Sequence, residues 1–250
     1  MKRIESFNMR FGESLFMFVS DHAGCNFPNH LNGLNLPKEE QERHITYDIG
    51  IKRFGRELSN RLDATLIEQH FSRLVIDCNR KPEREDCIPK ISDGTVILGN
   101  QNMDIESRKW RYDNIFMPYQ AQISKTLLER LEKKKETIFV SLHSFTPQLR
   151  GSSFIRPWEV GLLFHHDTET SKRFKQILSE KSPNLCIGEN EPYFLDLEKE
   201  YTVPMQAASK NIPALEIEIR QDILINPKSF QSFLDLFYQC FLQLERDLLK

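Results

Sequence analysis

Residues 15–24 read LFMFVSDHAG and residues 137–144 read TIFVSLHS, so each begins with a short apolar run that leads to a histidine. Similar runs at 64–69, 74–77, 160–164 and 214–219 are typical of buried strands. Between the runs, apolar residues at spacings of three and four predict helices over 48–62, 121–135, 169–180 and 227–249. This alternation predicts a single α/β domain over residues 1–250, with a mostly parallel or mixed central sheet and helices on both faces.

The composition is that of a globular protein with a substantial core. Of the 250 residues, 39% are hydrophobic and 28% are charged, and the net charge is −2. A charge this close to zero argues against non-specific binding to nucleic acid, which needs a basic surface. No stretch approaches 18 apolar residues, so no membrane-spanning helix is expected. The five cysteines include no closely spaced pair, which favours the reducing cytoplasm over a disulfide framework. The charged stretch KPEREDCIPK at 81–90 is expected to be an exposed loop or lid.

Polar, reactive residues follow several of the predicted strands. Because chemistry gathers at the carboxyl ends of strands in open α/β sheets, these residues are expected to meet at one edge. His22 and His143 are candidate zinc ligands, since a catalytic zinc takes three protein ligands and keeps an open position. The alternative is that both are buried, hydrogen-bonded histidines. Asp48 lies four residues after His44 and is either a third ligand or a solvated carboxylate near a helix start.

The stretch SRLVIDCNR at 72–80 places Arg73 and Arg80 on either side of a predicted strand. A guanidinium binds carboxylates through a planar fork and polarises a carbonyl without losing its proton. Asn79 adds an amide donor beside Arg80, and Asp77 is positioned to orient that arginine. A structural salt-bridge cluster explains the same residues equally well.

In LEIEIRQD, at 215–222, Glu216 and Glu218 alternate with apolar residues and therefore point to one face of the predicted strand. Carboxylates on a buried strand are costly unless they are paired or functional. A general base beside a metal meets that description. The alternative is a buried pair between glutamate and Arg220 or Arg73.

Seven short motifs occur in a fairly specific order and spacing: HAGxxxP at 22–28, RHITYDIG at 43–50, SRLVIDCNR at 72–80, SLHSFTP at 141–147, RPWEVG at 156–161, ENEPY at 189–193 and EIEIRQD at 216–222. Together they resemble the N-formylglutamate amidohydrolase family, over most of the chain. That family is allied to the zinc carboxypeptidases and aspartoacylases, so the resemblance implies a zinc-peptidase-like fold of the phosphorylase/hydrolase type.

The resemblance also implies roles for particular residues. His22, Asp48 and His143 would hold Zn²⁺, Glu218 would be the general base, and Arg73 would polarise the scissile carbonyl. The remaining residues that match the family motifs would bind the substrate; they are Asn79, Arg80, Ser144 and Arg220.

Two positions depart from the related patterns. Where the carboxypeptidases carry a glutamate ligand three residues after the first histidine, this chain has Cys25. Asp48 is therefore expected as the third ligand, with Cys25 and Glu216 as alternatives. The stretch PMQAASKN, residues 204–211, lacks a histidine that relatives often carry before the last strand, which puts the usual substrate in doubt.

The expected activity is hydrolysis of the amide bond in an N-acyl, N-formyl-like amino acid by water that zinc activates. The expected partner is thus a small molecule carrying a carboxylate, with no nucleic acid and no membrane. Two alternatives remain, a non-catalytic carboxylate-binding protein of the same fold and a carboxypeptidase-like amidase acting on peptides or cell-wall fragments. The sequence does not choose among acyl groups and leaves the oligomeric state open.

Overall fold

The computed structural model of the chain describes residues 4–165 and 167–248. Seven strands form one sheet in the order β1-β3-β2-β6-β9-β7-β8, and two short strands form a separate hairpin. The sheet strands are β1 (Phe7–Arg10), β2 (Phe16–Ser20), β3 (Thr65–Gln69), β6 (Ile138–Phe145), β7 (Val160–Leu163), β8 (Ile187–Glu189) and β9 (Ala214–Arg220). The hairpin strands are β4 (Ile91–Ser92) and β5 (Thr95–Val96).

The α-helices are α1 (Lys38–Gln41), α2 (Ile51–Leu62), α3 (Ile105–Arg111), α4 (Met117–Glu132), α5 (Thr168–Lys181), α6 (Gln221–Ile225) and α7 (Pro227–Leu248). The four long helices that the sequence predicts are present, with ends that shift by a few residues; residue 249, the predicted end of the last one, lies outside the described residues. None of the described helices is long and apolar enough to cross a membrane.

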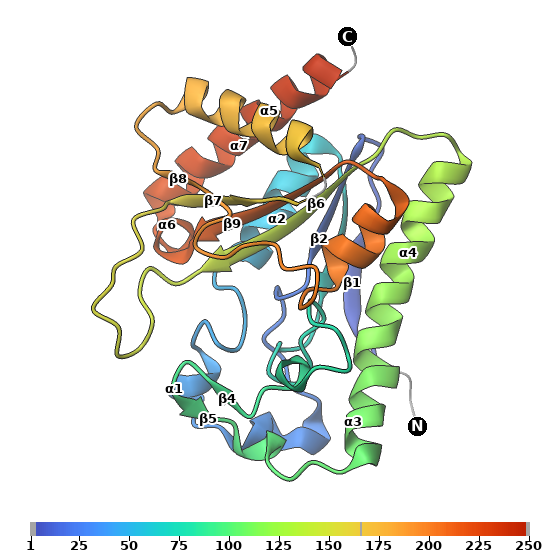
Figure 1. Cartoon of the computed structure of the whole chain (residues 1–250), viewed down its shortest axis with the longest axis vertical. Helices are drawn as coiled ribbons and strands as arrows, with labels where there is room; N and C mark the ends of the chain where they lie inside the picture. Colours follow the sequence, from blue (N-terminus) through green and yellow to red (C-terminus); the bar gives the residue numbers. More distant parts are fainter. Residues whose placement is uncertain (1–3, 166, 249–250) are drawn as a thin grey trace.

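The sheet separates two apolar cores, which gives the protein three layers (Figure 1). One core packs α2, α5, α6 and α7 against one face of the sheet, and it includes Phe54, Phe174 and Phe237. The other core lies under α4 and includes Tyr119, Ile123 and Phe139. Helices thus cover both faces of the sheet, as the sequence predicts, and α4 stands along one side of the molecule in Figure 1.

The centre of the sheet is parallel and its flanks are mixed. Strands β3, β2, β6 and β9 run parallel to one another, whereas β1 pairs antiparallel with β3 and β7 pairs antiparallel with β9. The sheet is therefore mixed, within the predicted fold class. Parallel neighbours bring the carboxyl ends of β2, β6 and β9 to the same edge, above the loop-rich half of the molecule (Figure 1).

The prediction of a strand at 74–77 is wrong. Residues 73–75 and 78–79 form turns, and residues 76–77 belong to no regular element. The Ser72 hydroxyl accepts a hydrogen bond from the Leu74 amide at 3.1 Å, and the Ser72 carbonyl accepts one from the Val75 amide at 2.9 Å. Such local bonds from serine give the backbone an alternative to strand pairing. The apolar side chains of Leu74, Val75 and Ile76 are nevertheless buried. The apolar run therefore reflects burial in the core, although the backbone pairs with no strand.

The stretch at 81–90 is only partly the exposed loop that the sequence suggests. It contains a short 3₁₀ turn, Glu85–Cys87, and the side chains of Cys87 and Ile88 are buried. The Cys87 carbonyl accepts a hydrogen bond from the Asp77 amide at 2.7 Å. The loop is thus attached to the segment that carries Arg73 and Asp77, and it supports that segment.

Candidate active site

The two histidines and Glu218 come from neighbouring strand ends. His22 follows β2 by two residues, whereas His143 and Glu218 lie on the adjacent strands β6 and β9 and are directly paired in register. Because these strands are parallel, their carboxyl ends present all three side chains at one edge of the sheet.

Two glycines next to these residues pack closely against neighbouring backbone. A Cβ on Gly24, in the HAG motif, would lie 2.3 Å from the His70 carbonyl oxygen. Gly161 lies on β7 and pairs with Glu218 of β9, and a Cβ on it would lie 2.1 Å from the Glu191 carbonyl oxygen. Real Cβ atoms do not approach backbone this closely, so each position requires glycine.

Asp48 reaches the histidines from the segment that precedes α2. Its amide donates to the His22 carbonyl at 2.9 Å, and its Oδ2 accepts a hydrogen bond from the Ser144 amide at 3.0 Å. The Ser144 hydroxyl donates to the Ile49 carbonyl at 2.9 Å. The Asp48 segment is therefore bound to both strand ends, which fixes the direction of its carboxylate.

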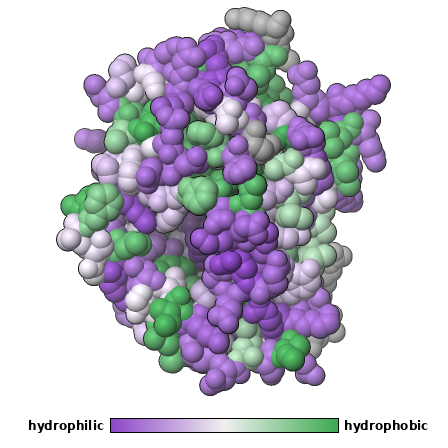
Figure 2. Space-filling model, viewed as in Figure 1, coloured by the Kyte–Doolittle hydropathy of each residue, from purple (hydrophilic) through white to green (hydrophobic). Residues whose placement is uncertain are grey.

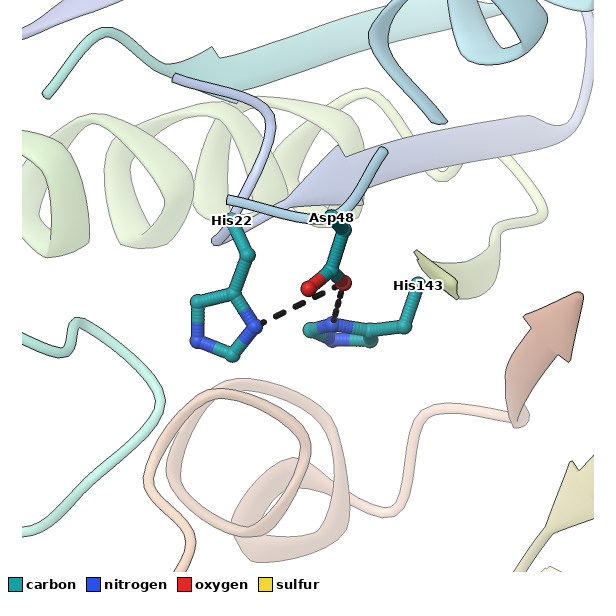
Figure 3. Close-up of side chains that lie close together, drawn as sticks. All are labelled: His22, Asp48 and His143. Atoms are coloured by element: carbon teal, nitrogen blue, oxygen red, sulfur yellow. Dashed lines mark hydrogen bonds and ion pairs between the residues drawn. The ribbon is translucent and has the colours of Figure 1, made fainter. Parts of the chain in front are cut away.

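His22, Asp48 and His143 form a buried cluster whose ligand atoms lie within 4.8 Å of one another. Asp48 Oδ2 is 2.9 Å from His143 Nδ1 and 3.6 Å from His22 Nδ1, and Figure 3 shows both rings turned toward this carboxylate. Two imidazoles and one carboxylate are a ligand set that catalytic zinc uses.

The outer nitrogens of both rings also have polar partners, a carboxylate for His22 and a hydroxyl for His143. His22 Nε2 is 2.8 Å from Asp77 Oδ1. His143 Nε2 is 3.0 Å from the Ser141 hydroxyl and 3.6 Å from Asp21 Oδ2. Metal-binding histidines almost always use the second nitrogen in this way, which fixes the tautomer and the ring orientation.

One buried atom of this cluster has no hydrogen-bond partner. His22 Nδ1 is buried and lies 3.6 Å from Asp48 Oδ2, too far for a hydrogen bond. A buried nitrogen without a partner is costly, and a metal ion would satisfy it. The residues present therefore fit a metal ion in chemistry and in arrangement.

Asp77 also binds Arg73. Its Oδ2 lies 2.7 Å from Arg73 Nη2, and its Oδ1 accepts the Asn79 amide at 2.9 Å. Burial alone would raise the pKa of Asp77, but the charges of Arg73 and His22 hold that pKa well below its usual range. Asp77 is therefore a carboxylate that joins the histidine to the arginine. The sequence analysis assigned it to Arg80 instead.

Glu218 is the cavity carboxylate with the properties expected of a general base. It is buried and its Oε2 has no hydrogen-bond partner. Burial raises the pKa of Glu218 to about 7, and the nearby His143 opposes that rise. A carboxyl group with a pKa near neutrality is able both to accept and to return a proton.

The cluster, Arg73 and Glu218 open into one cavity of about 300 Å³. Hydrophilic side chains gather at the middle of the face seen in Figure 2, where the loop after β8 crosses in Figure 1. Eighteen residues line the cavity: His22, His44, Asp48, Arg73, Asn79, Arg80, His143, Ser144, Phe145, Thr146, Leu163, Tyr193, Phe194, Asp196, Lys199, Glu200, Glu216 and Glu218.

Three of the four predicted substrate-binding residues line this cavity, namely Asn79, Arg80 and Ser144. Arg220 does not. Its guanidinium binds Asp222 at 2.8 Å and the carbonyls of residues 156–158, so it supports the loop before β7.

The structure also distinguishes among the three candidates for the third ligand. Cys25 is exposed and does not belong to the cluster, and Glu216 lines the cavity without joining it. Of the three candidates, Asp48 is the one that the structure brings to the two histidines.

Several residues of the cavity were not predicted from the sequence. Tyr193, Phe194, Lys199 and Glu200 come from the loop after β8 and line the cavity. The ENEPY motif, which ends at Tyr193, was the available signal. Periodicity gave none, because this loop has no regular structure that a hydrophobic pattern would reveal.

Comparisons with known proteins identify the family of this chain. The family model described as N-formylglutamate amidohydrolase matches residues 14–225. A solved structure of a gene product from Agrobacterium tumefaciens is similar at 26% identity and a TM-score of 0.92, and the match covers 99% of this chain and 98% of that one. A structure titled N-formylglutamate amidohydrolase from Ralstonia eutropha JMP134 is similar at 14% identity and a TM-score of 0.71, over 97% and 98% of the two chains. At that identity the second likeness shows the fold alone. No curated protein matches the chain.

Proposed function

Because this chain belongs to the N-formylglutamate amidohydrolase family, we propose that it is a zinc-dependent hydrolase of an N-acyl, N-formyl-like amino acid. The observation that carries the proposal is the buried cluster of His22, Asp48 and His143, which opens into the same cavity as Glu218. The substrate is a small molecule with a carboxylate next to the amide bond. A reducing compartment such as the cytoplasm is part of the proposal, because all five cysteines are free.

His22, Asp48 and His143 would hold the metal ion, with Asp77 orienting the His22 imidazole and the Ser141 hydroxyl orienting that of His143. When bound there, Zn²⁺ lowers the pKa of a coordinated water toward neutrality and polarises a carbonyl oxygen. The choice of zinc rests on the ligand set, since imidazole and carboxylate together suit this ion.

Glu218 serves as the general base. Its unpaired carboxylate oxygen accepts a proton from the attacking water and later donates that proton to the leaving amine nitrogen. The pKa of about 7 suits both transfers near neutral pH. The products are a carboxylic acid, such as formate, and a free amine.

Arg73 stabilises the negative charge that develops on the carbonyl oxygen. Asp77 holds one end of its guanidinium at 2.7 Å, and its Nη1 lies 3.6 Å from Asp48 beside the histidine cluster. An arginine held in place before the reaction contributes to the transition state without reorganising.

Arg80 and Asn79 bind the substrate carboxylate. Arg80 has no close ion pair, since Asp86 and Glu200 lie 3.8 and 3.9 Å away. Its guanidinium is therefore available for a bidentate carboxylate. Because this carboxylate does not change during the reaction, the contact sets affinity and register.

The test is hydrolysis measured with and without metal. Protein stripped by a strong chelator and protein reloaded with one equivalent of Zn²⁺ are incubated with N-formyl and N-acetyl amino acids and with dipeptides, and the free amine is quantified. We expect amine release from the N-acyl amino acids by the reloaded protein alone. Equal activity of the metal-free protein contradicts the zinc mechanism. Binding without turnover by the zinc-loaded protein identifies the non-catalytic alternative, and turnover of the dipeptides alone identifies the peptidase.

A further inference from the structure

The cavity contains two buried carboxylates that the proposed mechanism does not use. Glu216 lies two residues before Glu218 on β9, so the two side chains share one face of the sheet at different depths. Glu200 reaches the same cavity from the loop after β8. Both residues are at most 6% exposed.

Each of these carboxylates has an oxygen without a partner. The Oε2 atoms of Glu200 and Glu216 are buried and accept no hydrogen bond. Both groups line the same cavity. Burial raises the pKa of Glu216, and the negative charge of Glu200 raises it further. A pKa raised in this way keeps a carboxyl group neutral while it has no partner, and a cationic ligand beside it would favour the ionised form.

The protein's own cations do not satisfy the pair. Within the described residues no lysine, arginine or histidine nitrogen lies within 4.0 Å of Glu216, and the contact from Arg80 to Glu200 is 3.9 Å long. The two other cavity cations are engaged elsewhere, Lys199 with Asp196 at 2.9 Å and Arg73 with Asp77 at 2.7 Å. A cation that pairs closely with either carboxylate would therefore come from outside the chain.

A second metal ion suits the site poorly. In the part of the chain that the structure describes, the cluster of His22, Asp48 and His143 is the one place where three ligating groups meet within 4.8 Å. Glu200 and Glu216 lack a third ligand at such a distance. Two carboxylates without a third are instead suited to a protonated amine, which donates up to three hydrogen bonds.

We propose that Glu200 and Glu216 form a subsite for a protonated amine of the substrate, so that the preferred substrate carries both a carboxylate and an ammonium group. This inference rests on the proposed function and specifies its substrate class. Arg80 would take the carboxylate while the subsite takes the ammonium group nearby. An amino acid with a free α-amine and an acylated side chain has this chemistry, and so does an Nα-acyl amino acid with a basic side chain.

The experiment compares three substrates on the zinc-loaded protein. Nα-formyl-lysine has a free side-chain amine, Nε-formyl-lysine has a free α-amine, and N-formyl-norleucine has neither. We expect kcat/KM for one of the lysine isomers to exceed that for N-formyl-norleucine by about 10- to 100-fold, as for a hydrogen bond to a charged group. The isomer that is preferred shows which amine the subsite takes.

Variants connect this preference to the subsite. Glu216→Gln and Glu200→Gln keep the side-chain shape and remove the charge, so each should bring the ratio of kcat/KM between the preferred lysine isomer and N-formyl-norleucine toward one. Glu57→Gln is the matched control, because Glu57 pairs with Arg53 on the surface of α2. Its ratio should equal that of the unchanged protein. A ratio near one in the unchanged protein, or a preference that survives both subsite variants, overturns the proposal.

Binding separates the failure of this proposal from the failure of the proposed function. If no N-formyl compound is hydrolysed, calorimetry compares hexanoate, which has no amine, with norleucine, which adds an α-amine, and with lysine, which adds a side-chain amine as well. A gain in affinity from either amine that is lost in Glu216→Gln supports the subsite even without turnover, and equal binding of all three compounds overturns it. Zinc stoichiometry completes the test, since two ions per chain that fall to one in Glu216→Gln would assign the pair to a second metal.

Discussion

Asp77→Asn is expected to weaken zinc binding although Asp77 is not a ligand. In the structure Asp77 accepts bonds from His22 Nε2 at 2.8 Å, from Arg73 at 2.7 Å and from the Asn79 amide at 2.9 Å. Asparagine retains one acceptor oxygen and replaces the other with a donor. The new NH₂ group then faces either the imidazole N–H or the guanidinium, and one charge-assisted bond is lost.

The expected size follows from that loss. Replacing the group that orients a metal-binding histidine costs about 10- to 100-fold in metal affinity. This range equals about 1.4–2.7 kcal/mol and agrees with the value of about 1.5–3 kcal/mol for a hydrogen bond to a charged group. Because Arg73 would lose its anchor in the same variant, kcat should fall even when zinc is saturating.

The assay is competition for Zn²⁺ against a chromogenic chelator at fixed pH. Asp222→Asn is the matched control, because Asp222 binds Arg220 at 2.8 Å outside the cavity. Thermal unfolding of the metal-free proteins shows whether either substitution disturbs the fold. The reasoning is refuted if Asp77→Asn, while folded, binds zinc within about twofold of the unchanged protein, or if Asp222→Asn weakens binding equally.

Three further predictions concern the ligands, the base and the substrate contact. Asp48→Ala should weaken Zn²⁺ binding by orders of magnitude and Cys25→Ser should change it little, because Asp48 joins the histidine cluster and Cys25 is exposed; the reverse order in a chelator titration would make Cys25 the ligand. Glu218→Gln should lower kcat by about 10²–10⁴-fold with zinc still bound, as for the loss of a general base; steady-state kinetics with full kcat would remove Glu218 from that role. Arg80→Ala should mainly raise KM, since its carboxylate partner does not react; an unchanged KM for an N-formyl amino acid would place the carboxylate elsewhere.

The sequence predicted the elements that are long or buried on both faces. The apolar runs that became β2, β3, β6, β7 and β9 were found, because their patterns reflect burial in the sheet. The short edge strands β1 and β8 were missed, since few of their residues are buried. The false strand at 74–77 shows the converse limit: burial alone does not distinguish a strand from a turn that packs into the core.

The ligand cluster was predictable from strand ends and motif resemblance together. Strand ends indicate His22 and His143, but a loop residue such as Asp48 is indicated by the HITYD motif alone. The role of Asp77 was not predictable, because the carboxylate is 55 residues from His22 in sequence and the two meet only through the fold. Arg220 was predicted to bind substrate because of its position in a family motif. In the structure its side chain binds Asp222 and a backbone carbonyl outside the cavity.

Glu216 and Glu218 show how far a two-residue period carries the argument. The period places both carboxylates on one face, and the structure confirms this, since both line the cavity. It does not give their depth. Glu218 pairs in register with His143, in the histidine cluster, whereas Glu216 pairs with Ser141, two residues further from the strand end. Under the proposed mechanism, Glu218 acts on water beside the cluster of His22, Asp48 and His143. Under the proposed subsite, Glu216 binds a part of the substrate that does not react, so a change at Glu216 should alter the choice of substrate more than the rate of the chemical step.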